Sequence, residues 1–266
     1  MFGRLFHRKN RALISELVRT DFKLRYQGSV LGYAWSLLQP LFFFVILYFV
    51  FSYLKINKGV PHYSVYLLIG IVLWTFFREM TAASITSIVG RGDLIRKIRI
   101  PRWIIILSTS ISATISLGFN IVVLLIFVYF NHVHLTPSSL WFFALIGEVY
   151  IFAIGISLFL SAAYVRYRDV SYIWDVILQG GFYLTPIIYP ITKIPNLTVQ
   201  KIMMLNPMSQ SIQDARYTTI WNGTQTTSQT FAGGWYKFIP YLIILVCFAG
   251  GLAYFRKRSR YFAEDI

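Results

Sequence analysis

Ionisable side chains are the groups with which this chain could do chemistry, and almost all of them lie outside its long apolar runs. Of the ten Asp and Glu residues, only Glu79 and Glu148 lie well inside such runs, together with one basic residue, Arg78. If these runs span a membrane, an ionisable group within one costs free energy, so it marks a functional or a pairing site. Arg78 and Glu79 point to different helix faces and do not pair as simple neighbours. For the two acids, a proton relay and an interhelical hydrogen bond or salt bridge are both open.

The common catalytic and nucleotide-binding motifs are missing from the sequence. It contains no DxD, GxSxG or HExxH motif and no phosphate-binding GxxxxGK[ST] loop. The single cysteine, Cys247, excludes an intrachain disulfide and a cysteine-based zinc site. We therefore expect no catalytic residue, no metal site and no cofactor in this chain. The missing acidic motif also counts against a membrane-bound sugar or acyl transferase.

The composition is that of an integral membrane protein. Hydrophobic residues make up 56% of the chain and charged residues 13%, with a mean hydropathy of +0.60, whereas soluble domains carry about 25% charged residues. Runs of membrane-spanning length occur at 37–54, 63–89, 103–130, 140–163, 172–189 and 238–255. The sequence therefore predicts an all-α protein whose 266 residues form one domain with six transmembrane helices.

The distribution of basic residues predicts the orientation of these helices. Lys and Arg outnumber Asp and Glu by 25 to 10. With the N-terminus in the cytoplasm, eighteen of the basic residues fall in the cytoplasmic segments 1–36, 87–103, 164–171 and 256–266, and six fall in the outer segments. This positive-inside bias predicts that both termini are cytoplasmic, and it explains the basic excess without a nucleic-acid partner.

Two segments outside the spans carry helical patterns of their own. Before the first span, Leu13, Ile14, Leu17, Val18 and Phe22 recur at helical spacing opposite charged residues, which predicts an amphipathic helix in the cytoplasmic interface. The outer segment 190–237 contains two short apolar stretches, the second opening with Asn206 as a helix N-cap and Pro207 at the first helical position. We interpret these stretches as two short re-entrant helices, with a surface loop carrying interfacial helices as the alternative.

The segment 90–102, GRGDLIRKIRIPR, stands between two apolar runs and carries six charges. Pro101 ends any helix there, so about two helical turns fit after Gly92. The basic residues could act only as topology anchors. Leu94, Ile95 and Ile98 add an apolar side that an anchor does not need and that suits docking into a groove of another protein.

Aromatic residues reach 18% of the chain. Those near span ends are typical of interfacial belts, but the first span carries more rings than a belt requires. Packing against lipid is one interpretation, and rings that line a path for sugars are the other. The channel-lining candidates are Phe42, Phe43, Tyr48, Phe49, Trp74, Tyr183 and Tyr189.

Five stretches together resemble the membrane subunits of ABC exporters of the type-two class. They are RTDFKLRYQGSVLGYAWSLLQPL (19–41), DLIRKIRIPR (93–102), YVRYRDVSYIWD (164–175), FYLTPIIYP (182–190) and LNPM (205–208). The sequence is most similar to the branch that exports O-antigen, capsular polysaccharide or teichoic acid. The stretches cover almost the whole chain in the family's order.

The resemblance implies a homodimer that works with two copies of a separate ATPase, which would hold ATP and Mg. It implies that the loop between spans two and three is a coupling helix docked on that ATPase, through Asp93, Leu94, Arg96, Lys97, Ile98, Arg99 and Arg102. A second, smaller contact would involve Arg166, Arg168 and Asp169. An interface helix that meets the lipid head group would carry Arg19, Asp21, Lys23, Arg25 and Tyr26.

The expected function is thus export of a lipid-linked polysaccharide across the bacterial inner membrane. Two alternatives remain at this point. One is an ABC exporter of lipid or small molecules, because the class is broader than its polysaccharide branch. The other is a proton-coupled transporter that uses Glu79 or Glu148.

Overall fold

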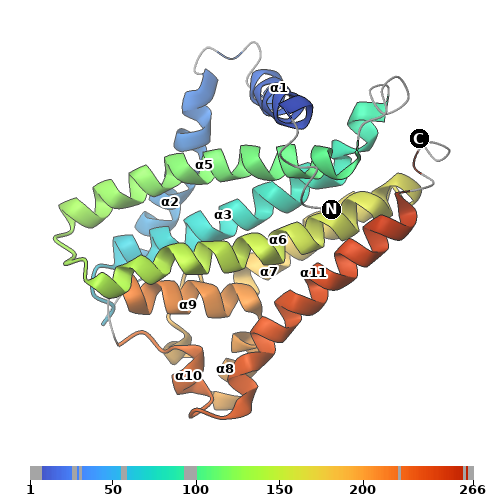
Figure 1. Ribbon diagram of the computed structural model, residues 1–266. Coiled ribbons are helices and arrows are strands. Elements are labelled where there is room, and N and C mark those ends of the chain that lie inside the picture. The colour runs from blue at the N-terminus through green and yellow to red at the C-terminus, as the bar shows by residue number, and fades with distance from the viewer. Residues whose placement is uncertain are drawn as a thin grey trace.

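The computed structural model describes residues 8–25, 29, 32–54, 59–92, 101–220, 223–259 and 262, and within these ranges helices are the only regular elements (Figure 1). This confirms the all-α class. The α-helices are α1 (Arg8–Arg25), α2 (Trp35–Tyr53), α3 (Tyr63–Ser87), α5 (Trp103–Phe130), α6 (Trp141–Arg166), α7 (Val170–Leu184), α8 (Leu197–Met204), α9 (Pro207–Thr219), α10 (Thr227–Thr230) and α11 (Ile239–Arg258). Short 3₁₀ turns occupy Gly32–Ala34, Val89–Arg91, Pro137–Leu140, Ile191–Lys193 and Trp235–Phe238.

Four helical segments of the described chain are long and apolar enough to cross a membrane. They are Tyr63–Ser87, Trp103–Phe130, Pro137–Arg166 and Trp235–Arg258, with 24 to 30 residues each, and about 20 residues span the hydrocarbon core. The first predicted span corresponds to α2, whose apolar part, Leu37–Tyr53, is shorter. Length and composition therefore support four of the six predicted spans.

The fifth predicted span, 172–189, is not one continuous helix. Helix α7 has 15 residues, and at 1.5 Å per residue it extends roughly 22 Å, less than the ~30 Å of a hydrocarbon core. The helix ends at Leu184 because Pro186 disfavours helical backbone at the residue before it, and Thr185 is extended with ψ 133°. The chain after α7 is consequently unwound, with backbone carbonyls free to accept other donors.

Helix α3 is the central helix of the bundle. It lies between α5 and α6 (Figure 1) and also contacts α2, α7 and α9. Buried residues make up 78% of its most apolar stretch, against 22% for that of Trp235–Arg258. The outer helices therefore present apolar side chains outward, as a membrane requires, while α3 is enclosed by protein.

Helices α6 and α11 form the most extensive helix pair, and two glycines permit their close crossing. A Cβ added at Gly251 would lie 2.0 Å from the backbone oxygen of Gly155. A Cβ added at Gly155 would lie 2.6 Å from Cα of Phe248. Small residues at such crossings let helix backbones approach, which is a common way to pack helices in membranes.

The predicted amphipathic N-terminal helix is confirmed as α1, which packs along α5 (Figure 1). Leu17 and Phe22 are buried, and Leu13, Ile14 and Val18 are partly buried. The charged side chains on the opposite face, Arg11, Glu16, Arg19 and Lys23, are exposed.

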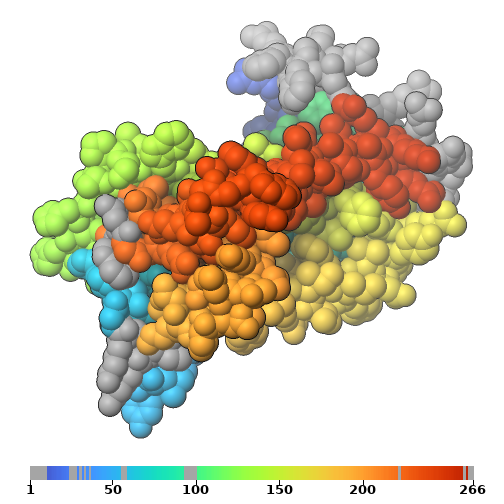
Figure 2. Space-filling model, turned by 90° about the horizontal axis from the view of Figure 1, so that it is seen from below, coloured from blue at the N-terminus to red at the C-terminus, as the bar shows by residue number. Residues whose placement is uncertain are grey.

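The two short helices predicted in the segment 190–237 are α8 and α9. We call this end of the bundle the outer end, and the opposite end the inner end, after the predicted topology. The Asn206 side chain accepts a hydrogen bond from the backbone N–H of Met208, so its predicted role as the N-cap of α9 is confirmed. Asn196 caps α8 in the same way through the N–H groups of Thr198 and Val199. Helix α9 lies against α6 and is largely buried. In Figure 2, the orange surface of this segment adjoins the red surface of α11.

We predict that Gly251→Ala destabilises the protein, because its methyl group would overlap the backbone of α6. Overpacking of this kind costs about 1–3 kcal/mol of the free energy of unfolding. Thermal unfolding of the purified protein in detergent measures the change. Gly250→Ala is the matched control, since a Cβ there meets nothing within 4 Å. Equal melting temperatures for the two variants would contradict the close crossing.

Candidate functional site: the inner end and an intramembrane cavity

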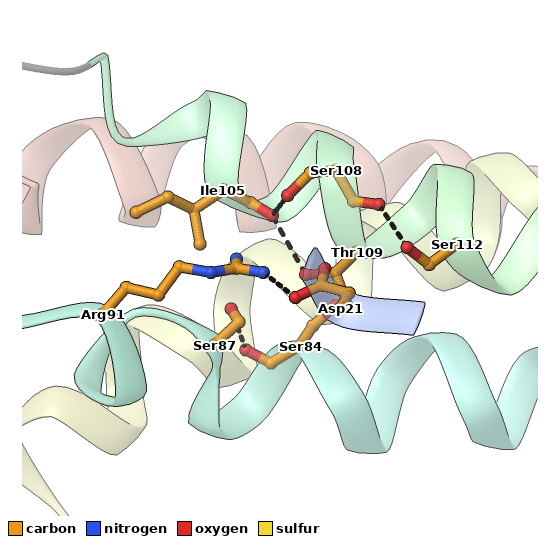
Figure 3. Close-up of polar contacts among 8 residues, drawn as sticks. All are labelled: Asp21, Ser84, Ser87, Arg91, Ile105, Ser108, Thr109 and Ser112. Atoms are coloured by element: carbon orange, nitrogen blue, oxygen red, sulfur yellow. Dashed lines mark hydrogen bonds and ion pairs between the residues drawn. The ribbon is translucent and has the colours of Figure 1, made fainter. Parts of the chain in front are cut away.

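The 3₁₀ turn Val89–Arg91 after α3 is joined by an ion pair to α1, the predicted interface helix. Arg91 binds Asp21 of α1 through its guanidinium (Figure 3). The two side chains are only 16% and 23% exposed. Around them, the hydroxyls of Ser87, Ser108 and other small residues bond to carbonyls of their own helices, so they add no link between elements. The ion pair thus fixes α1 to the first residues of the predicted coupling segment, 90–102.

A second arginine, Arg102, is the last residue of that segment and one of its predicted docking residues. Arg102 donates a hydrogen bond to the backbone carbonyl of Ser259, just beyond α11, and its guanidinium lies 5.9 Å from the ring centre of Phe262. The predicted coupling segment is therefore attached at one end to α1 and at the other to the C-terminal end of α11. Six of its predicted docking residues lie outside the described residues: Asp93, Leu94, Arg96, Lys97, Ile98 and Arg99.

The predicted second cytoplasmic contact lies at the corner between α6 and α7. Arg166, Arg168 and Asp169 are all exposed there. The guanidinium of Arg168 lies 5.0 Å from the ring centre of Tyr164, and that of Arg166 lies 5.4 Å from that of Tyr167. These residues are free to meet a partner, and their docking role remains a prediction.

The interface-helix candidates divide into two groups. Arg19 and Lys23 are exposed, whereas Asp21 is engaged by Arg91. The side chain of Arg25 and the whole of Tyr26 lie outside the described residues. The exposed pair could meet an anionic surface, while Asp21 has a structural partner.

A cavity of about 730 Å³ lies between the inner half of α2 and α3. It contains both charged residues that the sequence places within the second span, Arg78 and Glu79. The Glu79 carboxylate accepts a hydrogen bond of 3.0 Å from Ser116 of α5. The complete lining is Ser29, Trp35, Gln39, Pro40, Phe43, Thr75, Arg78, Glu79, Ala82 and Ala83.

The aromatic channel candidates occupy different environments. Phe43 lines the cavity, and Phe42, Phe49 and Tyr183 are exposed. Trp74 instead belongs to the core, where it packs on Phe182 of α7 at 6.0 Å between ring centres. Tyr48 is partly buried and stacks on Tyr63, and Tyr189 donates a hydrogen bond to the carbonyl of Tyr183.

The second intramembrane acid, Glu148, takes part in a polar cluster near the outer end of the bundle. The amide of Gln210 on α9 donates to Asp214, to Tyr241 of α11 and to Glu148 of α6, at 2.8, 3.2 and 3.4 Å. The cluster ties three helices together. Burial raises the pKa of the Asp214 carboxyl, and hydrogen bonds from Gln210 and from the backbone of Thr227 oppose that rise. Both intramembrane acids are therefore held in contacts between helices.

Arg216 is the most deeply buried charge of the described chain, with no exposed surface. Its guanidinium donates to the carbonyls of Tyr66, Pro186 and Ile187 at 3.0, 2.7 and 2.6 Å. It also lies 3.5 Å from the ring centre of Tyr66. Gly70 leaves room for it, because a Cβ there would come within 2.7 Å of Nη2. Arg216 thereby joins α9 to α3 and to the unwound chain after α7.

The sequence alone predicted no role for Arg216 or Gln210 and no partner for Asp21. In the charge count, Arg216 was only one of the basic residues of the outer segment. Its partners are backbone carbonyls, 29, 30 and 150 positions away, which carry no side-chain signal. Arg91 stands 70 positions from Asp21, and no local pattern pairs them.

Comparison with known proteins decides the family. The sequence matches the model of the ABC-2 type transporter over residues 12–220. The chain belongs to the ABC-2 type transporter family. This confirms the resemblance drawn from the five sequence stretches. Membership makes the chain a multi-pass membrane component of an ABC transporter with an ATPase partner, and not an enzyme.

Related ABC-2 permeases are known from two bacteria. An O-antigen export system permease protein RfbA of Klebsiella pneumoniae is 30% identical over 256 residues, which cover 95% of this chain and 94% of that protein. A protein of the same name from Myxococcus xanthus is 28% identical over 203 residues, which cover 74% and 76%. The similarity therefore includes both the inner end and the outer helices.

We predict that Arg216→Met destabilises the outer helices of this ABC-2 permease. The substitution leaves three buried carbonyls without their donor, which costs at least about 3 kcal/mol of the free energy of unfolding. Hydrogen–deuterium exchange should rise across residues 185–219. Lys201→Met is the control, because Lys201 is exposed on α8. Unchanged exchange in Arg216→Met would mean that the guanidinium does not hold α9.

Proposed function

We propose that this chain is the membrane-spanning subunit of an ATP-driven exporter of a lipid-linked polysaccharide of the O-antigen, capsule or teichoic acid type. The polymer would move from the cytoplasmic side across the bacterial inner membrane. The family match and the names of the relatives support the transport class and the cargo. The observation that carries the mechanical part is the attachment of both ends of the coupling segment, through Arg91 and Arg102.

The two attachments suggest how ATP binding moves the membrane helices. A partner ATPase that binds residues 93–100 would pull on Arg91 and Arg102 as it closes. Arg91 would pass the motion to α1 through Asp21, and Arg102 would pass it to the end of α11. ATP and Mg would belong to the partner, in agreement with the missing P-loop. This chain then supplies the transport path and the coupling segment that moves its helices.

The assembly in this proposal contains two copies of the chain and two copies of the ATPase. The six apolar runs support six membrane crossings, and the charge bias supports cytoplasmic termini. Helices α2 and α7 would complete the six, although each has a short apolar length. The exposed apolar face of α7, with Tyr172, Val176 and Tyr183, supports a contact with a second copy, since packing against protein can shield a short helix. Helices α8 and α9 would dip into the outer leaflet, where α9 is enclosed by protein as irregular segments there require.

We predict that Leu94→Asp combined with Ile98→Asp abolishes co-purification of the ATPase with this chain. The two charges would remove the apolar side of the coupling segment and so weaken its insertion into a groove. Affinity purification from membranes measures the captured ATPase. Leu135→Asp, at an exposed residue between α5 and α6, controls for the added charge. Capture of the ATPase at wild-type levels by the double variant would refute docking at this segment.

We further predict that Asp21→Asn lowers polymer export while leaving ATPase capture intact. The substitution removes the charge that holds Arg91, so motion of the coupling segment would no longer reach α1. We expect several-fold less polymer at the cell surface and continued ATP hydrolysis by the purified complex. Glu16→Gln is the matched control, because Glu16 is an exposed acid on the same helix. Equal export in both variants would show that the ion pair transmits nothing. If Asp21→Asn lowered the export of a lipid or small molecule and left polymer export unchanged, the alternative cargo would be favoured.

A further inference from the structure

Arg78 forms no ion pair within the described part of the chain, although the Glu79 carboxylate lines the same cavity. Arg78 lies on α3, is exposed, and lines the 730 Å³ cavity between α2 and α3. Its guanidinium takes part in no ion pair or hydrogen bond with the described residues, where the one ion pair joins Arg91 and Asp21. The adjacent Glu79 carboxylate instead accepts a hydrogen bond from Ser116 on α5. The positive charge is therefore directed into the cavity.

An arginine that has no pair among the described residues requires an explanation in a membrane helix. An arginine near the centre of a bilayer costs at least about 2.5 kcal/mol, and such residues face a wet cavity or pair with an anion. Arg78 stands nine residues before the end of α3 at Ser87, which places it roughly 13 Å along the helix from its inner end. The bundle thus maintains a cation inside the inner half of the membrane.

The remaining cavity wall suits a phosphate that is joined to sugar and lipid. Gln39 of α2 adds a side-chain amide donor, and Trp35 and Phe43 add exposed rings that are suited to apolar contact. Trp35 begins α2 at the inner end of the membrane, so the cavity extends from the inner surface to Arg78. The planar guanidinium of an arginine matches the geometry of phosphate oxygens and can donate hydrogen bonds to two of them at once.

We propose that this cavity binds the phosphate or pyrophosphate of the lipid-linked substrate, with Arg78 as its principal ligand and Gln39 as a second donor. The inference rests on the proposed function, because it names the part of the cargo that enters first. Exposed Arg19 and Lys23 on α1 would attract the anion at the membrane surface, and Arg78 would bind it inside the bundle. The aromatic side chains then contact the lipid or the first sugar.

The test measures binding of farnesyl pyrophosphate, a short lipid pyrophosphate, to the complex of this chain with its ATPase in phosphatidylcholine nanodiscs. Farnesol, which lacks the anion, is the paired probe. We expect the wild-type complex to bind farnesyl pyrophosphate at least about tenfold more tightly than farnesol. Arg78→Gln should remove most of this difference, and Arg78→Lys should keep part of it because the charge remains. Lys201→Gln, which removes an exposed cation on α8 outside the cavity, should bind as wild type does.

Several outcomes would overturn the inference. Wild-type affinity for farnesyl pyrophosphate in Arg78→Gln would show that Arg78 is not the ligand. If this variant also dissociated from a dimer into monomers, the counter-charge of Arg78 would be an acid of the second copy. Displacement of the probe by phosphatidylglycerol at equal concentration would show a site for any anionic lipid. Polymer export in cells separates this inference from the proposed function. Loss of export on deletion of the gene, with normal export and binding in Arg78→Gln, would refute only the inference. Normal export after the deletion would refute the proposed function.

Discussion

The buried guanidinium of Arg216 is the contact on which the outer half of the structure depends. A charge without any exposed surface is stable only when its hydrogen-bonding capacity is used, since the cost of removing it from water is several kcal/mol. Three backbone carbonyls and the face of Tyr66 supply this compensation. Two of the carbonyls, those of Pro186 and Ile187, are available only because the chain after α7 is unwound. The unwound segment and the buried arginine therefore stabilise each other.

This contact explains why α9 lies inside the bundle although it carries many polar side chains. Arg216 attaches one part of α9 to α3, and Gln210 attaches another part to α6 and α11. Buried polar groups that are bonded in this way specify one arrangement of helices, because any other arrangement would leave them unsatisfied. The outer end of the bundle is consequently held by several directional bonds.

The inner end is held differently. The hydroxyls of Ser87 and Ser108 bond within their own helices, and the ion pair between Arg91 and Asp21 is partly exposed. Partly exposed ion pairs contribute less than fully buried networks, about 1 kcal/mol or less at a solvated surface. The inner half of α2 also stands away from α3 and leaves the cavity that contains Arg78. Among the described residues, the outer end thus carries more buried hydrogen bonds between helices than the inner end, which is where a partner ATPase would act.

The sequence by itself determined the features that depend on local pattern and order along the chain. Apolar runs predicted the helices, helical spacing predicted the buried face of α1, and Asn206 with Pro207 predicted the start of α9, because each signal lies within a few residues of its effect. The order of five motifs identified the family. Only the tertiary structure decided that Arg216 binds carbonyls of two distant segments, that Arg91 pairs with Asp21, and that Arg78 lines a cavity without an ion-pair partner among the described residues. Such contacts depend on which helices meet in space, and neither periodicity nor residue type determines those neighbours when the partners are backbone groups or residues dozens of positions away.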